Sequence, residues 1–376
     1  MGNYQIGVLL GDDIGPEIVP HAVGTLAVAA EVSSGLRLQF IEMPIGAEAY
    51  KTTGYTLPPG TLERLKELDG WILGPLGHAA YPSDDPKALN PHPIIRRHFD
   101  LYANIRPSRS LPGVKALHDG VDLVIARENN EGMQPDRNMY KGNGEFMPTE
   151  DSALSVRVIT RRGSERIARA AFELGRARGQ ARLALGQNHL CGARPRVTII
   201  HKRTVFKLTC GLFVDTAREV AKDFPDIAVD EHQVDSFAMA VTMQPQRFDT
   251  ILVTNMFGDI LSDLTAGLVG GLGLAPGLNV GDRHAMAQAT HGSAPDIAGR
   301  NIANPYAIIM SAQMLLAWLG HRNSDGSALG AAQKIDQAVH SSLGADGVRT
   351  LDIGGSATTD DFGRAVIDRI RSSQAR

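Results

Sequence analysis

Two aspartates offer the clearest starting point for chemistry in this sequence of 376 residues. Asp259 and Asp263 are four residues apart in FGDILSD, so both carboxylates leave one face of a predicted helix start. Oxygen ligands in this arrangement suit Mg²⁺ or Mn²⁺. Acidic residues at the start of a helix are also favoured by the helix dipole alone. For an isolated pair of aspartates the dipole explanation is the more common one. Other motifs must therefore decide whether this pair binds a metal ion.

Three arginines lie in stretches that favour the metal interpretation. Arg96 and Arg106 are ten residues apart, and Arg127 directly follows the apolar stretch DLVIA. An arginine at the carboxyl end of a parallel strand stands where open α/β sheets bind their ligands. Guanidinium groups bind carboxylates in a bidentate manner. Arginines and aspartates together indicate a small polycarboxylate bound beside a metal ion.

Further candidates lie in three other stretches. Lys202 follows VTIIH at the expected end of a strand, where a lysine can act as a base. Asp235, in an amphipathic segment, is either a helix cap or a third carboxylate. The loop HGSAPDIAG at 291–299 combines small residues with one acid, which is typical of backbone that approaches a flat ligand while a carboxylate accepts from a ribose. The spacing G-x-G-x-x-G is absent, so a standard Rossmann fold is not expected.

The elements that must position these residues alternate between apolar strands and helices. Strands are predicted at 4–10, 38–43, 70–73, 121–126, 197–200 and 250–253. Helices are predicted at 62–68, 164–178, 206–224, 260–268, 307–319, 331–343 and 360–372, with a loop at 324–330. Strands that are apolar throughout imply a mainly parallel sheet covered on both faces. Residues 129–150 break this pattern and are expected to leave the core.

Composition excludes several classes of protein. With 38 Lys and Arg against 41 Asp and Glu, the net charge of −3 gives no broad positive field, so no nucleic-acid partner is expected. The longest apolar stretch, 307–319, is too short to span a bilayer, and the first residues lack a signal-peptide pattern. Cys191 and Cys210 form no C-x-x-C pair, and Cys210 is expected in the core. We therefore expect a cytoplasmic protein without a membrane partner.

The motifs resemble those of the β-decarboxylating dehydrogenases, the family of 3-isopropylmalate, isocitrate, homoisocitrate and tartrate/D-malate dehydrogenases. The matching strings, in the family's order, are GDDIGPE, GPLG, DLYANIRP, DLVIARENNEG, HKRTVFK, FGDILSD and HGSAPDIAGRNIANP. The resemblance implies an α/β, isopropylmalate dehydrogenase-like fold of two lobes with a mainly parallel mixed sheet. The first lobe, 1–101 and 270–376, would bind the cofactor. The second, 102–269, would bind metal and substrate and form a homodimer with an arm at about 129–150.

The resemblance also implies a role for each motif. The arginines at 96, 106 and 127 would hold the malate carboxylates. The metal would be bound by Asp259, Asp263 and the partner subunit's Asp235, and the partner's Lys202 would help to deprotonate the C2 hydroxyl. The cofactor would be NAD, bound by His291, Gly292, Ser293, Asp296, Ile297 and Asn304. In this loop Asp296 would accept from the adenosine ribose and repel a 2′-phosphate.

Some positions depart from the family. Gln134 stands where a tyrosine is expected to protonate C3, so Tyr140 is the predicted replacement. Asn90 and His92 are polar or stiff where isopropylmalate enzymes present leucines to the C3 substituent, which predicts a pocket for a polar or small substituent. The remaining departures are Asp13 for glycine, Arg203 for a small residue and Thr204 for asparagine, together with the stretch QNHLCGARPR, which is longer than the short basic turn expected there.

The leading hypothesis is NAD- and Mg²⁺/Mn²⁺-dependent oxidative decarboxylation of a (2R)-3-substituted malate, with 3-isopropylmalate dehydrogenase as the nearest pattern. The alternatives within the family are isocitrate, homoisocitrate and tartrate/D-malate dehydrogenase. A catalytically silent homologue that regulates a partner, and an enzyme that oxidises without decarboxylation, also fit the departures.

Overall fold

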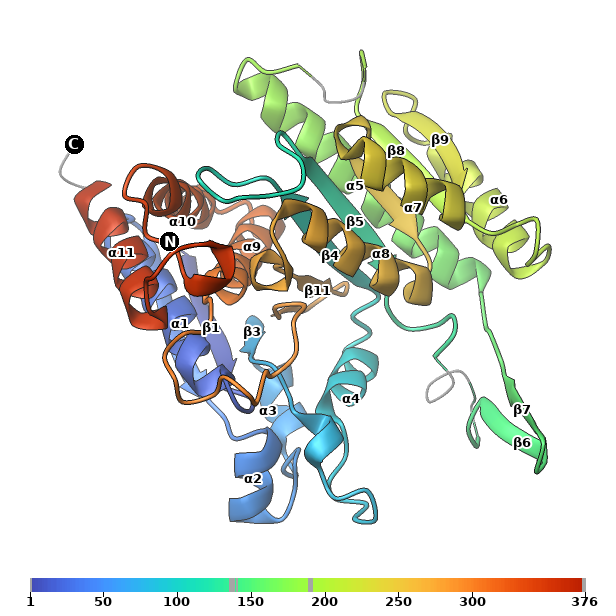
Figure 1. Cartoon of the computed structure of the whole chain (residues 1–376), viewed down its shortest axis with the longest axis horizontal. Coiled ribbons are helices and arrows are strands. Elements are labelled where there is room, and N and C mark those ends of the chain that lie inside the picture. The colour runs from blue at the N-terminus through green and yellow to red at the C-terminus, as the bar shows by residue number, and fades with distance from the viewer. Residues whose placement is uncertain (1, 135–138, 140, 189–191, 374–376) are drawn as a thin grey trace. The chain divides into compact units, whose positions relative to one another are not determined.

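The computed structural model describes residues 2–134, 139, 141–188 and 192–373, which form two compact units (Figure 1). The first unit contains residues up to 99, 111–117 and those from 270 onward, and the second contains 100–110 and 118–269. Residues 111–117 therefore belong to the first unit, although the sequence placed them in the second lobe. The predicted α/β fold with a large, mostly parallel sheet is confirmed.

The first unit is built on five strands in the order β2-β1-β3-β12-β11. These strands are β1 (Gly2–Leu9), β2 (Leu36–Glu42), β3 (Gly70–Leu73), β11 (Leu278–Val280) and β12 (Ala285–Ala287). All neighbours are parallel except β11 and β12. Four long helices pack on one another beside them: α1 (Gly15–Glu31), α9 (Tyr306–Arg322), α10 (Gly326–Gly344) and α11 (Thr359–Ser372). Three short helices complete the unit: α2 (Gly46–Thr53), α3 (Thr61–Lys66) and α4 (Pro91–His98).

The turn from β1 to α1 ties several loops together at the carboxyl end of the strands. Asp12 is buried, and its carboxylate accepts from the backbone N–H of Ala47 at 2.7 Å and of Gly77 at 2.8 Å. Its neighbour Asp13 has a φ of +52°. Aspartate tolerates this left-handed conformation better than most residues, but glycine adopts it at lower cost. A glycine, which the resemblance implies at this position, would adopt the same φ at lower cost than Asp13.

In the second unit, five strands of the large sheet follow the order β4-β5-β10-β8-β9. They are β4 (Ala103–Arg109), β5 (Asp122–Glu128), β8 (Arg196–His201), β9 (Ala228–Gln233) and β10 (Thr250–Val253), with only β4 antiparallel to its neighbour β5. The helices are α5 (Arg161–Ala184), α6 (Thr209–Ala221), α7 (Val234–Met243) and α8 (Asn255–Val269). Figure 1 shows α7 and α8 on one face of these strands and α5 on the other.

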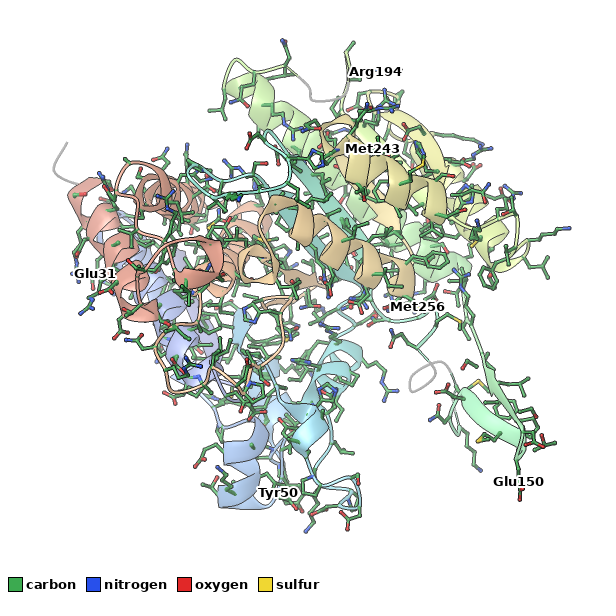
Figure 2. The ribbon with its side chains drawn as sticks, in the orientation of Figure 1. Glu31, Tyr50, Glu150, Arg194, Met243 and Met256 are labelled. Atoms are coloured by element: carbon green, nitrogen blue, oxygen red, sulfur yellow. The ribbon has the colours of Figure 1, made fainter. Side chains whose placement is uncertain are left out.

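A hairpin lies within the segment expected to form an arm. Strands β6 (Glu145–Thr149) and β7 (Ser152–Ser155) pair only with each other, and every residue in them is exposed. Figure 2 shows Glu150 at the turn of this hairpin. An isolated two-stranded hairpin is marginally stable in water.

Several element boundaries differ from the sequence-based expectation. Helix α8 begins at Asn255, so Asp259 lies beyond its first turn and the expectation of a helix start at that residue was wrong. The dipole explanation for this aspartate is weakened accordingly. Helix α10 begins at Gly326 within the expected loop, because Asp325 caps it by accepting from the N–H groups of Ser327 and Ala328. No helix in the described part of the chain is long and apolar enough to cross a membrane.

Candidate active site

Two arginines converge on one carboxylate in the second unit. Antiparallel pairing places Arg127 of β5 opposite Asn104 of β4, so Arg106, two residues further along β4, shares its face of the sheet. Helix α8 packs on these strands and carries Asp259. Arg106 Nη1 lies 3.0 Å from Asp259 Oδ1, and Arg127 forms an ion pair with the same oxygen. The structure therefore brings together two of the predicted substrate arginines and a predicted metal ligand.

Neighbouring polar groups fix the orientation of both guanidiniums. Arg127 Nη2 donates to Asn255 Oδ1 at 2.7 Å, and its Nε donates to the carbonyl of Asn255 at 2.9 Å. Arg106 Nη1 donates to Ser262 Oγ at 2.7 Å, and its Nε donates to Asn104 Oδ1 at 3.2 Å. Both side chains are buried. Hydrogen-bonded, buried cations of this kind hold their geometry before a ligand arrives.

The two aspartates of α8 present carboxylates that a hard cation could bind. The side chains of Asp259 and Asp263 are each 53% exposed, whereas the arginine side chains behind them are 9% and 5% exposed. Asp263 Oδ1 lies 3.9 Å from Arg106 Nη1. Partial burial raises the pKa of Asp263, an effect that the charge of Arg106 opposes and that of Asp259 reinforces. The oxygen donors, one helical turn apart, fit the preference of Mg²⁺ or Mn²⁺.

A third ligand for this pair is not found in the described part of the chain. Among the described residues, no group of three or more Asp, Glu, His or Cys side chains could hold a metal ion. Asp235 instead pairs with Lys202, whose Nζ lies 2.7 Å from Asp235 Oδ1. The hydrogen bond from Lys202 lowers the pKa of Asp235. Because β8 and β9 are parallel, with His201 opposite Gln233, the residues that follow them emerge side by side.

The residues that depart from the pattern implied by the resemblance have defined neighbours. Gln134 Nε2 donates at 3.2 Å to Asn255 Oδ1, the oxygen that also accepts from Arg127, so an amide lies close to this predicted substrate arginine. Arg203 forms a two-pronged ion pair with Asp215 of α6, at 2.8 and 3.3 Å. Thr204 Oγ1 donates to Gln233 at 2.7 Å. Tyr140 lies outside the described residues.

The remaining substrate candidates belong to the first unit. Asn90 is the N-cap of α4 and accepts from the N–H of His92 at 3.1 Å. Arg96 Nη2 donates to Gln288 Oε1 at 3.0 Å, and His92 Nε2 lies 2.5 Å from Gln288 Nε2. Sequence reasoning missed Gln288. Its only signal is a polar residue in the apolar stretch AMAQAT, which does not reveal a partner nearly two hundred residues away.

The predicted cofactor loop is anchored at its two ends. Glu17 of α1 accepts from the N–H groups of Gly299 at 2.5 Å and Asn301 at 2.8 Å, a role that the sequence did not reveal. The carbonyl of Ser293 accepts from the N–H of Ile14 at 3.2 Å. Asn304 Nδ2 donates to Asp352 at 3.0 Å. These bonds hold the loop to the turn between β1 and α1 and to the 3₁₀ turn at Leu351–Ile353.

The middle of the loop retains groups suited to a ligand. His291 Nδ1 lies 2.9 Å from the carbonyl of Gly292, while its Nε2 is buried and has no hydrogen-bond partner among the described residues. Burial lowers the pKa of His291, so the ring is neutral near neutral pH. Asp296 is exposed, and Ile297 packs partly buried against the core. At Gly292 no atom lies within 4 Å of where a Cβ would be, so the backbone is accessible.

Fold and site together define a class of protein: an α/β protein whose second unit holds two buried guanidiniums beside two half-exposed carboxylates. Residues 5–366 match the model of the isocitrate/isopropylmalate dehydrogenase family, so the chain belongs to this family of decarboxylating dehydrogenases. The predicted family is thereby confirmed.

Relatives with different specificities resemble the chain to similar degrees. It is 42% identical to an isocitrate/homoisocitrate dehydrogenase of Thermus thermophilus over 98% of this chain and 99% of the relative. It is 39% identical to a 3-isopropylmalate/3-methylmalate dehydrogenase of Methanocaldococcus jannaschii, with the same coverage. The crystal structure of isocitrate dehydrogenase from Methylococcus capsulatus matches with a TM-score of 0.81 and 36% identity, over 98% of this chain and 99% of that one. These relatives place the chain in the same family as the family model does.

A buried glutamate directly follows Arg127 in the chain. Glu128, the last residue of β5, is 2% exposed, and its two oxygens accept from the N–H groups of Asn130 and Glu131, each at 2.9 Å. Burial raises its pKa to about 7, against the two backbone hydrogen bonds. Protonation of Glu128 is therefore favoured by folding.

The free energy of unfolding should depend on pH through the titration of Glu128. Because the folded-state pKa lies above the unfolded value, the stabilisation by protonated Glu128 is complete below about pH 4.5 and is lost as the pH rises through about 7. The free energy of unfolding of the wild type should fall by about 3 kcal/mol relative to Glu128→Gln across this range. Urea unfolding at several pH values measures the difference. The exposed Glu165→Gln serves as control, and a pH-independent difference for Glu128→Gln would contradict the assignment.

Proposed function

We propose that this protein oxidises and decarboxylates a (2R)-3-substituted malate, with NAD as hydride acceptor and Mg²⁺ or Mn²⁺ as the cation, in the manner of 3-isopropylmalate dehydrogenase. The observation that carries the proposal is the convergence of buried Arg106 and Arg127 on half-exposed Asp259. Two fixed guanidiniums suit the carboxylates of a malate. The adjacent carboxylates of α8 suit a cation that must contact the same molecule.

Each side chain then has a defined task. Arg96, Arg106 and Arg127 bind and orient the substrate carboxylates, while Asp259 and Asp263 hold the cation together with the partner subunit's Asp235. The bound cation would supply Lewis acidity at the C2 hydroxyl and at the developing enolate. The Nζ atom of Lys202 of the partner subunit moves the proton of the C2 hydroxyl. The hydroxyl of Tyr140 is proposed to give the proton to C3.

The loop at 291–304 is proposed to bind NAD. The buried Nε2 of His291 has no hydrogen-bond partner among the described residues and can accept from a ligand donor. The accessible backbone at Gly292 allows a flat ligand to approach. The exposed carboxylate of Asp296 can accept from a ribose hydroxyl pair and would repel a 2′-phosphate, which favours NAD over NADP.

We further propose a homodimer formed through α7, α8 and the β6-β7 hairpin. These two helices pack on each other and expose four large apolar side chains: Met239 (66%), Met243 (69%), Met256 (36%) and Ile260 (62%). Figure 2 shows Met243 on α7 and Met256 on α8. Exposed apolar surface of this kind indicates an interface. A second copy would also bring its Lys202 and Asp235 to Asp259 and Asp263, for which the described residues of the same chain provide no third ligand.

One observation favours an alternative outcome. Gln134 occupies a place beside Asn255 and Arg127 and cannot act as an acid near neutral pH. If Tyr140 does not replace the family tyrosine, the protein either oxidises its substrate without completing the decarboxylation sequence or binds ligands without turnover. Separate measurement of NADH and CO₂ distinguishes these cases.

A substrate panel tests the activity. With NAD and Mn²⁺, the purified full-length protein should form NADH and an equal amount of CO₂ from at least one of 3-isopropylmalate, isocitrate, homoisocitrate, tartrate or D-malate. The variant Asp263→Asn should lower kcat/KM for that substrate by about a hundredfold or more, since loss of a cation ligand removes a large electrostatic contribution. No NADH from any compound, with calorimetry showing no NAD binding, would refute the proposal.

Mixing two inactive variants tests the shared site. Lys202→Met and Asp263→Asn homodimers should each be nearly inactive, whereas subunit exchange places both lesions in one of the two sites of each hybrid. The other site is intact, so random exchange should restore up to about a quarter of wild-type activity. The control is the double variant Lys202→Met/Asp263→Asn mixed with either single variant, which leaves no intact site. Hybrids isolated with two affinity tags that show no recovery would contradict the shared site.

A further inference from the structure

A hydrogen-bond network within the first unit fixes two half-buried side chains of α4. Gln288 directly follows β12 and is 7% exposed. Its Oε1 accepts from Arg96 Nη2 at 3.0 Å and from Asn279 Nδ2 at 3.3 Å. Its other terminal atom, Nε2, lies 2.5 Å from His92 Nε2. One amide thus contacts both predicted substrate side chains of α4.

The network determines the protonation of His92. Arginine and asparagine nitrogens are donors, so the Gln288 atom that they both contact must be the amide oxygen. The other atom is then the NH₂ group, which has only hydrogens to offer and must donate to His92 Nε2. A neutral imidazole that accepts at Nε2 carries its proton at Nδ1. The amide therefore selects one tautomer of the ring.

The surrounding charges keep this imidazole neutral. Burial lowers the pKa of His92 well below its ordinary value, and the positive charge of Arg96 and the ring of His78 act in the same direction. Gln288, which directly follows β12, contributes no charge. His92 therefore offers a single N–H donor throughout the neutral pH range.

His92 and Arg96 are four residues apart on α4 and lie on one face of the helix. We propose that Gln288 is a positioning residue that presents the Nδ1–H of His92 as a donor beside Arg96, so that the site prefers a malate whose C3 substituent carries an oxygen acceptor, such as a carboxylate, over one with a branched alkyl group. The inference rests on the proposed function, because it takes Arg96 to bind the malate.

The preference follows from the cost of an unmade hydrogen bond. An alkyl substituent placed against the Nδ1–H excludes water without accepting the proton, and a desolvated donor left without a partner is unfavourable. Sites that present a polar group discriminate strongly against ligands that lack its complement. In the wild type, kcat/KM should accordingly be at least about tenfold higher for isocitrate or homoisocitrate than for 3-isopropylmalate.

The tautomer can be measured independently of turnover. Nitrogen-15 NMR of the histidine-labelled protein, assigned by comparison with His92→Phe, should show His92 as the neutral Nδ1–H form from about pH 6 to 8. An Nε2–H form, or a ring protonated at neutral pH, overturns the inference.

The variant Gln288→Glu should reverse the role of the imidazole. A carboxylate can only accept, so neutral His92 would donate from Nε2 to it and expose an acceptor at Nδ1. At pH 8 the ratio of kcat/KM for isocitrate to that for 3-isopropylmalate should fall about tenfold, mainly through KM. As the pH falls and the ring becomes protonated, Nδ1 regains its proton and the ratio should recover. The new carboxylate also affects Arg96, but this effect should change kcat/KM equally for both substrates, because they share the malate core. It therefore cancels in the ratio.

Two controls complete the test. Gln333→Glu places the same charge on the exposed side of α10 and should leave the ratio unchanged at every pH. His92→Phe removes the donor and should lower the ratio without pH dependence, which keeps the inference testable if Gln288→Glu does not fold. If the protein turns over its substrates but neither Gln288→Glu nor His92→Phe changes the ratio of kcat/KM values, this inference is overturned and the proposed function is not. Absence of turnover with every malate overturns the proposed function and the inference with it.

Discussion

The ion pairs that join Arg106 and Arg127 to Asp259 are the interaction on which the site depends. Two guanidinium groups are buried behind one carboxylate, and a buried cation is stable only when it is paired and hydrogen-bonded. Asp259 satisfies this need while its own side chain stays half exposed. The same carboxylate can therefore face the arginines on one side and a metal ion on the other. This arrangement requires that β4 and β5 keep their pairing register and that α8 keeps its packing on these strands.

The second unit supplies that register through its sheet. Antiparallel pairing of β4 with β5 sets the two arginines on one face, and α8 packs across them. Parallel pairing of β8 with β9 places Lys202 beside Asp235. Two reactive clusters thus arise from two strand pairs. Within one chain the metal aspartates have no third acidic ligand in the described residues, which is the physical reason for proposing a second subunit.

Sequence reasoning succeeded where chemistry lies in local motifs. The family, the α/β fold and the buried Cys210 were all predicted correctly. It failed where structure depends on distant partners. Strands β4 and β9 were missed because they are polar and lack an apolar run, and they are recognisable only beside β5 and β8. Gln288 and Glu17 carry no local signal, because their roles are defined by residues far away in the chain. The roles of these residues and the existence of these strands therefore follow from tertiary contacts, which a local motif does not reveal.

The central claim is that one carboxylate cluster couples cation binding to binding of a hydroxy acid. Titration of Mn²⁺ followed by electron paramagnetic resonance, with and without isocitrate or 3-isopropylmalate, tests it most directly. The account predicts that one of these acids tightens Mn²⁺ binding by about tenfold or more, through ligands that both share, and that Asp259→Asn abolishes this coupling. Mn²⁺ affinity that is indifferent to every hydroxy acid, or coupling that survives in Asp259→Asn, would contradict it.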